Sequence, residues 1–63
     1  MDEQEKEKMI EYLERLKKAR RELVKLQIEF NNPQDKVRLG GKVEGVVLAI
    51  SYFEEAFPSL SNT

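Results

Sequence analysis

The chain has 63 residues and a formal net charge of −1, with 11 lysines and arginines against 12 aspartates and glutamates. A chain of this length forms one domain and buries a smaller fraction of its surface than a larger domain does. It has no cysteine and no histidine, which excludes disulfides, thiolate metal sites and the commonest general base. Self-association is the remaining way to stabilise so small a fold. The near-neutral charge argues against bulk attraction to nucleic acid or anionic membranes.

The apolar residues form no run long enough to span a bilayer, which takes about 20 residues. The longest run, from Val46 to Ile50, has five. The first eight residues are mostly charged, unlike a signal peptide. We therefore expect a cytoplasmic protein without membrane contact.

The first helix is predicted over residues 3–30. Asp2 is suited to cap it, and Glu5 stands three residues later, as in a capping box. Met9, Leu16, Leu23 and Phe30 recur every seven residues and form one stripe along the helix. Three further sets flank this stripe: Tyr12, Ala19 and Leu26 on one side, Leu13, Arg20 and Gln27 on the other, and Ile10, Val24 and Ile28 further round. This apolar face is too wide for a single neighbouring helix.

Arg20 and Gln27 are polar residues inside the apolar face. A polar residue at a helix seam often sets register or oligomeric state, at a cost in stability. The alternative is that the packed stripe bends away from both residues. A third possibility is that Arg20 pairs with Glu54 of the second helix.

Asn31 and Asn32 are predicted to form a turn, and a second helix is predicted over residues 33–57. Asn32 is a favourable N-cap and Pro33 fits the first helical position. The short connection requires the two helices to be antiparallel. Pro58 should end the second helix and leave residues 58–63 as a frayed tail.

The second helix is apolar on more than one side. One face carries Leu39, Val43, Val46, Val47, Ile50, Phe53 and Phe57, while Leu48, Tyr52 and Val37 point almost the opposite way. Gly41, Gly45 and Ala49 form a strip of small residues. A helix that is apolar on several sides must be surrounded. We therefore expect an all-α antiparallel two-helix hairpin that dimerises into a four-helix bundle, with an interface of Gly41, Gly45, Leu48, Ala49, Tyr52, Val24 and Ile28.

Two features of the second helix leave alternatives open. Gly40 and Gly41 each cost about 1 kcal/mol inside a helix, so they could break it into two pieces. The segment from Val46 to Phe53 is rich in β-branched and aromatic residues, which could favour a strand. A helical period sustained over about five turns favours the helix.

Lys17, Lys18, Arg21 and Lys25 form the basic part of the first helix and could contact phosphates. Glutamates four residues away, such as Glu14 before Lys18, would neutralise them and make this a solvated face.

The acids Glu44, Glu54 and Glu55 are the nearest candidates for acid–base chemistry or metal binding, but nothing in the sequence brings two of them together. We expect no catalytic residue, no cofactor and no metal, and so no enzyme.

The layout of both helices resembles that of the plasmid repressor-of-primer family, helical-hairpin dimers of similar length that bind RNA. No RNA-contacting motif of that family matches, so only its architecture is implied here. The segments Leu39–Gly45 and Ser51–Glu55 resemble small uncharacterised open reading frames of phages and prophages of Gram-positive bacteria. This second resemblance implies an accessory protein that binds and blocks a host protein.

The sequence thus predicts a non-enzymatic homodimer that binds another macromolecule, a host protein, as an inhibitor or regulator. One alternative is a nucleic-acid-binding regulator that uses the basic residues of the first helix. Another is a structural subunit of a larger assembly.

Overall fold

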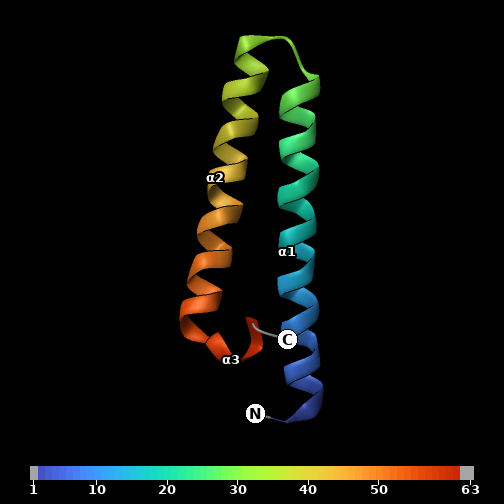
Figure 1. Cartoon of the computed structure of the whole chain (residues 1–63), viewed down its shortest axis with the longest axis vertical. Coiled ribbons are helices and arrows are strands. Elements are labelled where there is room, and N and C mark those ends of the chain that lie inside the picture. Colours follow the sequence, from blue (N-terminus) through green and yellow to red (C-terminus); the bar gives the residue numbers. More distant parts are fainter. Residues whose placement is uncertain (1, 62–63) are drawn as a thin grey trace.

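The computed structural model describes residues 2–61, which form a helical hairpin measuring 46 × 16 × 15 Å. Helix α1 spans Glu3–Glu29, α2 spans Pro33–Ala56 and a short α3 spans Pro58–Ser61. Figure 1 shows α1 and α2 running side by side in opposite directions. The described residues contain helices and no strand, which confirms the all-α class.

Helix α1 begins where the sequence predicts. The Asp2 side chain accepts a hydrogen bond from the backbone N–H of Glu5 at 2.8 Å, satisfying one of the donors left free in the first turn. Glu3 and Glu5 place negative charge at the positive end of the helix dipole. The helix continues without interruption until Phe30, whose backbone turns extended.

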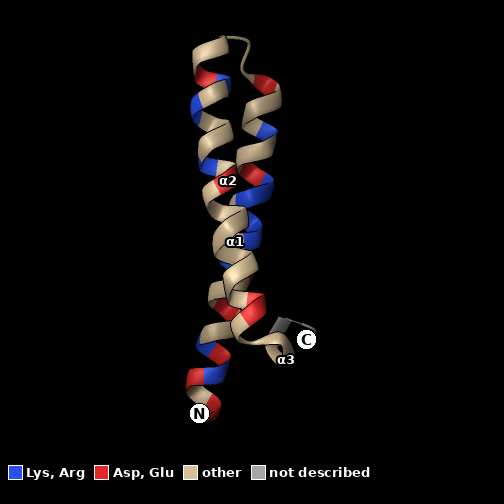
Figure 2. Cartoon of the chain, turned by 90° about the vertical axis from the view of Figure 1, so that its left-hand side faces the viewer, with Lys and Arg blue, Asp and Glu red and all other residues tan. Residues whose placement is uncertain are grey.

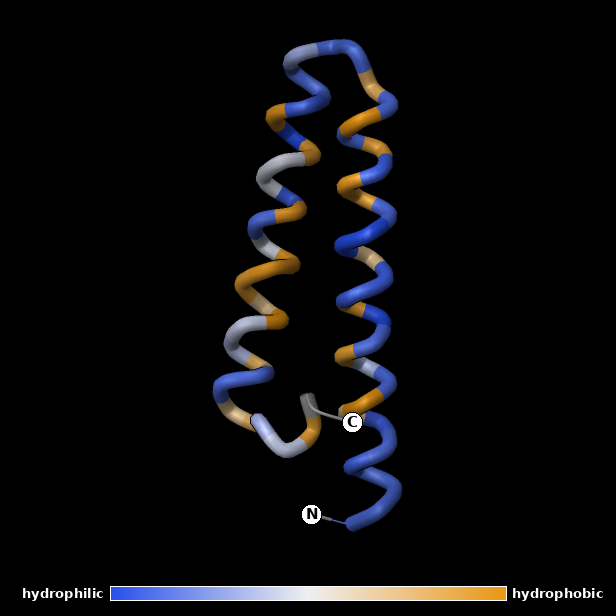
Figure 3. Tube along the Cα trace, in the orientation of Figure 1, coloured by the Kyte–Doolittle hydropathy of each residue, from blue (hydrophilic) through white to orange (hydrophobic). Residues whose placement is uncertain are grey.

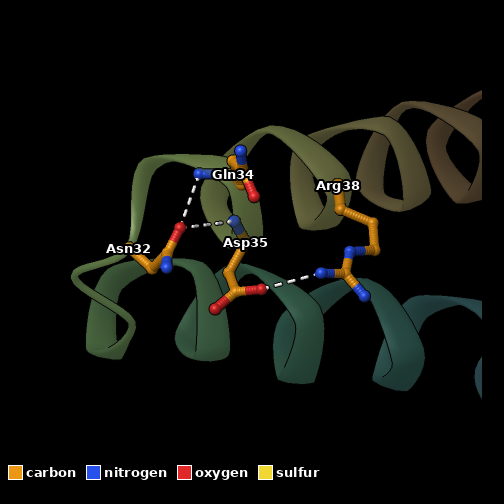
Figure 4. Close-up of polar contacts among 4 residues, drawn as sticks. All are labelled: Asn32, Gln34, Asp35 and Arg38. Atoms are coloured by element: carbon orange, nitrogen blue, oxygen red, sulfur yellow. Dashed lines mark hydrogen bonds and ion pairs between the residues drawn. The ribbon is translucent and has the colours of Figure 1, made fainter.

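The turn between the long helices is held by Asn32. Its side-chain oxygen accepts hydrogen bonds from the backbone N–H groups of Gln34 at 2.8 Å and Asp35 at 3.4 Å (Figure 4). Pro33 occupies the first turn of α2, where it needs no hydrogen-bond donor. Arg38 donates to the Asp35 carboxylate at 2.9 Å, one turn further along. Local chemistry therefore defines where α2 starts.

Replacing this cap should weaken the hairpin. We expect Asn32→Ala to lower the free energy of unfolding by about 1 kcal/mol, because two backbone donors lose their acceptor. Urea titration followed by circular dichroism measures the change. Asn32→Asp keeps an acceptor oxygen and should stay close to the native stability.

Helix α2 is continuous from Pro33 to Ala56, so neither the glycine break nor the strand considered for this segment occurs. Both Gly40 and Gly41 lie within the helix, and no described glycine has a positive φ. The caps at Asn32 and the helical spacing of the apolar residues outweigh the glycine cost of about 1 kcal/mol each.

The core is thin and lies along the line where α1 and α2 meet. Among the described residues only Leu13, Leu39, Ile50 and Leu60 are buried. Val43, Val46 and Phe53 are half-buried, as the predicted inner face requires, whereas Val47 is 39% exposed at its margin. In Figure 3 the apolar segments of the two long helices face one another across the hairpin, and further apolar stretches of α2 face outward. Because only two long helices pack together, most of the inner-face side chains around these four buried residues remain partly exposed to water.

The prediction of a frayed tail is wrong for residues 58–61. Pro58 ends α2 as expected, but the chain then forms α3, which turns back toward α1 (Figure 1). Leu60 is only 3% exposed, as deeply buried as Leu13 and Ile50. The segment is polar and begins with a proline, so its sequence gave no sign that Leu60 packs into the core. This one leucine closes the open end of the hairpin. Residues 62 and 63 of the predicted tail lie outside the described residues.

Candidate binding surfaces

The outer side of α2, turned away from α1, carries an apolar strip. Val37 is 76% exposed, Leu48 53% and Tyr52 64%. Gly41 and Gly45 lie on the same side and are also exposed. Figure 2 looks onto this side, and much of the middle of α2 is free of charged residues there. We call these five residues, Val37, Gly41, Gly45, Leu48 and Tyr52, the outer strip.

Gly41 and Gly45 have open space around them. A methyl group added at either position would meet no atom within 4 Å, whereas one added at Gly40 would lie 3.1 Å from the Gln27 side-chain nitrogen. The two exposed glycines therefore have no packing role within a single chain.

This difference makes a testable prediction. Gly41→Ala and Gly45→Ala should each raise the free energy of unfolding by up to about 1 kcal/mol, because alanine is the better helix former. Gly40→Ala should gain less, because the added methyl group presses on Gln27. Thermal unfolding of the three variants measures this. A loss of stability at position 41 or 45 would mean that another chain packs closely there.

The interface residues predicted from the sequence fall on separate parts of the hairpin. Gly41, Gly45, Leu48 and Tyr52 lie on the outer side of α2, and Ala49 is half-buried beside them. Val24 is 38% exposed and Ile28 73%, but both belong to α1. Since the outer side of α2 is turned away from α1, these residues do not form one continuous patch within a chain.

Gln27 forms a hydrogen bond between the two long helices of the same chain. Its side-chain amide donates to the backbone carbonyl of Lys36 at 3.3 Å, next to Gly40. This contact joins α1 to the start of α2, and so it fixes how the two helices align near the turn. Arg20 is half-buried. The suggested pairing of Arg20 with Glu54 is wrong, because within residues 2–61 the only ion pair joins Arg38 to Asp35.

The basic residues of α1 lie on its outward side. Lys18, Arg21 and Lys25 are exposed, and Lys17 is half-buried. A shallow depression on this side is lined by Arg15, Lys17, Lys18 and Arg21 together with Glu11 and Glu14. The glutamates form no ion pair with these bases in the described part of the chain. They nevertheless make the surface mixed in charge, which weakens its attraction for phosphates.

An aromatic cluster joins the open ends of the long helices. The Tyr12 and Phe53 rings lie 6.4 Å apart and the Phe53 and Phe57 rings 5.4 Å apart, both tilted as aromatic pairs prefer. Tyr12 is still 54% exposed. No local pattern in the sequence pairs these aromatics with one another. The antiparallel alignment, which places residue 12 level with residue 53, could have revealed their contact.

In the described ranges no group of three or more aspartate or glutamate residues is placed to hold a metal ion. Glu44 and Glu55 are exposed and Glu54 is half-buried. No helix within residues 2–61 has the length and apolar character needed to cross a membrane.

Comparison with protein-family models, with curated proteins and with solved structures found no match to this chain in any of the three.

Proposed function

We propose that the chain is a non-enzymatic homodimer that binds another protein and acts as an inhibitor or regulator. The observation that carries this proposal is its exposed apolar surface. Among residues 2–61, ten large apolar side chains are at least about a third exposed, against four that are buried. Surface of this kind marks sites of protein–protein contact.

The total surface of the chain supports self-association. The chain exposes 5015 Å², whereas a monomeric protein of 7.4 kDa exposes about 4,200 Å². The excess is about 800 Å², close to the area that each partner buries in a stable protein–protein interface. Burial of this excess by a second copy would bring the exposed surface to the level usual for a folded protein of this mass.

The outer strip is the surface proposed for the target. It combines Leu48 and Tyr52, both more than half exposed, with two glycines that let another backbone approach. Tyrosine is one of the residues enriched at the binding hot spots of protein interfaces. The net charge of −1 favours a protein target over a nucleic acid. The resemblance to phage open reading frames makes a host protein the candidate target.

Two measurements test the proposal. Sedimentation equilibrium at micromolar concentration should give twice the chain mass, and a stable monomer would overturn the homodimer. Affinity capture from a bacterial lysate should recover a protein with the native chain and lose it with Tyr52→Glu. Lys18→Glu, on an exposed part of α1, serves as the matched charge control. Equal capture by all three chains would remove the outer strip as the binding surface.

Nucleic-acid binding is the second candidate, because Lys18, Arg21 and Lys25 are exposed and form no ion pair within the described residues. It predicts binding that falls steeply with salt concentration. A gel shift at low salt with duplex DNA, single strands and RNA hairpins tests it, and the absence of any complex excludes it. A structural role in an assembly would instead appear as oligomers larger than dimers during sedimentation.

A further inference from the structure

Helix α1 carries an apolar seam that α2 covers only in part. Apolar residues follow each other at alternating spacings of three and four, the pattern of helices that pack along a long seam. The seam residues are Met9, Tyr12, Leu16, Ala19, Leu23, Leu26 and Phe30. In such a pair the partner helix lies over the middle of the seam.

Burial shows which parts of the seam stay open to water. Leu13, beside the seam, is 3% exposed, and Gln27, two residues before the end of α1 on the same side, bonds to Lys36. On the other side of the seam Tyr12 remains 54% exposed and Leu26 38%. The Tyr12–Leu26 flank is therefore only partly covered within the chain, where Phe53 contacts Tyr12.

The third helix does not cover this flank. In Figure 2, α3 stands to one side of the plane that contains the long helices. Its leucine, Leu60, is buried, yet Tyr12 stays more than half exposed near the same end of the hairpin. The partly exposed flank of α1 continues onto α2 through Phe53, which contacts Tyr12, and through the half-buried Val46 and Ala49. Together they form one open side of the hairpin.

Charged residues along the edge of this flank indicate what covers it. Lys8, Arg15, Glu22 and Glu29 recur every seven residues and are all exposed, two bases followed by two acids. When two copies of α1 align antiparallel so that Leu16 packs on Ala19 of the second copy, this order brings Arg15 to Glu22 and Lys8 to Glu29. Each contact occurs twice because the two copies are equivalent.

The parallel alignment lacks this complementarity. Parallel seams bring each edge residue close to the residue five positions later in the other helix. For Arg15 that residue is Arg20, which lies on the Leu13–Gln27 side of α1 that faces α2, so Arg15 would meet no acid in a parallel pair. The charge pattern of α1 therefore distinguishes between the two orientations.

We infer that α1 packs antiparallel against α1 of a second copy, through Tyr12, Ala19 and Leu26, with Arg15 paired to Glu22 across the interface. This inference rests on the homodimer proposed above and identifies its contact surface. The two α2 helices then meet through Val46, Ala49 and Phe53, which completes a four-helix bundle. The outer strip stays uncovered and free for a target. Of the interface residues predicted from the sequence, only Ala49 belongs to the contact inferred here, and Gly41, Gly45, Leu48 and Tyr52 lie on the outer strip.

Charge exchange tests the pairing. Arg15→Glu and Glu22→Arg should each weaken self-association by about tenfold or more, because like charges then meet twice in every dimer. The double variant should return to within about threefold of the native dimer. An equimolar mixture of the two single variants should form a heterodimer as stable as the native one, since each chain supplies the charge that the other lacks. Sedimentation equilibrium measures all four samples, and Lys18→Glu is the control.

A matched pair of leucine variants tests the surface independently. Leu26→Glu should dissociate the dimer and leave a folded helical monomer, whereas Leu48→Glu should leave the dimer intact. If Leu48→Glu dissociates the dimer and Leu26→Glu does not, the dimer contact lies on the outer strip. This result would overturn the inferred contact but would still support the homodimer. If the single charge variants and their mixture all associate like the native chain, the antiparallel pairing falls. A native monomer would overturn the homodimer itself and this inference with it.

Discussion

Ile50→Asp should unfold the protein. Ile50 is 3% exposed at the centre of α2 and belongs to a core of only four buried side chains among the described residues. The substitution removes apolar contacts and places a charge where nothing can pair with it, at a combined cost of more than about 4 kcal/mol. A chain of this size has only about 3–5 kcal/mol of stability. Far-UV circular dichroism should show loss of most helical signal at 25 °C.

The matched control is Lys18→Glu, which also changes the charge on a helix but at an exposed position. Its free energy of unfolding should stay within about 0.5 kcal/mol of the native value. If Ile50→Asp kept a cooperative, native-like unfolding transition, the face of α2 that packs on α1 would be misassigned.

Leu60→Ala should destabilise the chain by about 2 kcal/mol, a large share of the total for so small a fold. Leu60 is 3% exposed because α3 turns it toward α1 and closes the open end of the hairpin. A frayed tail would predict no change at all. Urea unfolding at a fixed protein concentration measures the difference, since dimerisation makes apparent stability concentration-dependent.

Ser59→Ala, one residue earlier in α3 and exposed, is the control and should change stability by less than about 0.5 kcal/mol. Equal unfolding midpoints for Leu60→Ala, Ser59→Ala and the native chain would contradict the role of α3 in closing the core.

The second copy and the target protein are expected to bind different parts of the apolar surface. The open side of the hairpin, with Tyr12, Leu26 and Phe53, is assigned to the second copy, and the outer strip of α2 to a target protein. Since the two surfaces lie on different sides of the molecule, a charge at position 26 and a charge at position 52 should have separable effects. The first should change the dimer, and the second should change target binding alone.

Local sequence patterns determined the secondary structure of this protein. Asp2 and Asn32 are capping residues, Pro33 and Pro58 fit only at helix boundaries, and the apolar residues repeat with a helical period, so both long helices were predicted to within one residue. These features act over a few residues, so they define the helices independently of the tertiary contacts. The connection of Asn31 and Asn32 likewise required the helices to return antiparallel.

Only the tertiary structure decided which apolar residues are covered. Heptad spacing placed Met9, Leu16 and Leu23 on one stripe, but the rotation of α1 against α2 leaves Tyr12 and Leu26 outside and brings Leu13 and Gln27 inside. It also buried Leu60, which lies in a stretch with no periodic pattern. A helix that is apolar over a wide arc has several nearly equivalent ways to pack. The choice between them depends on contacts between distant residues, such as Tyr12 with Phe53 and Gln27 with Lys36, and local patterns do not encode these contacts.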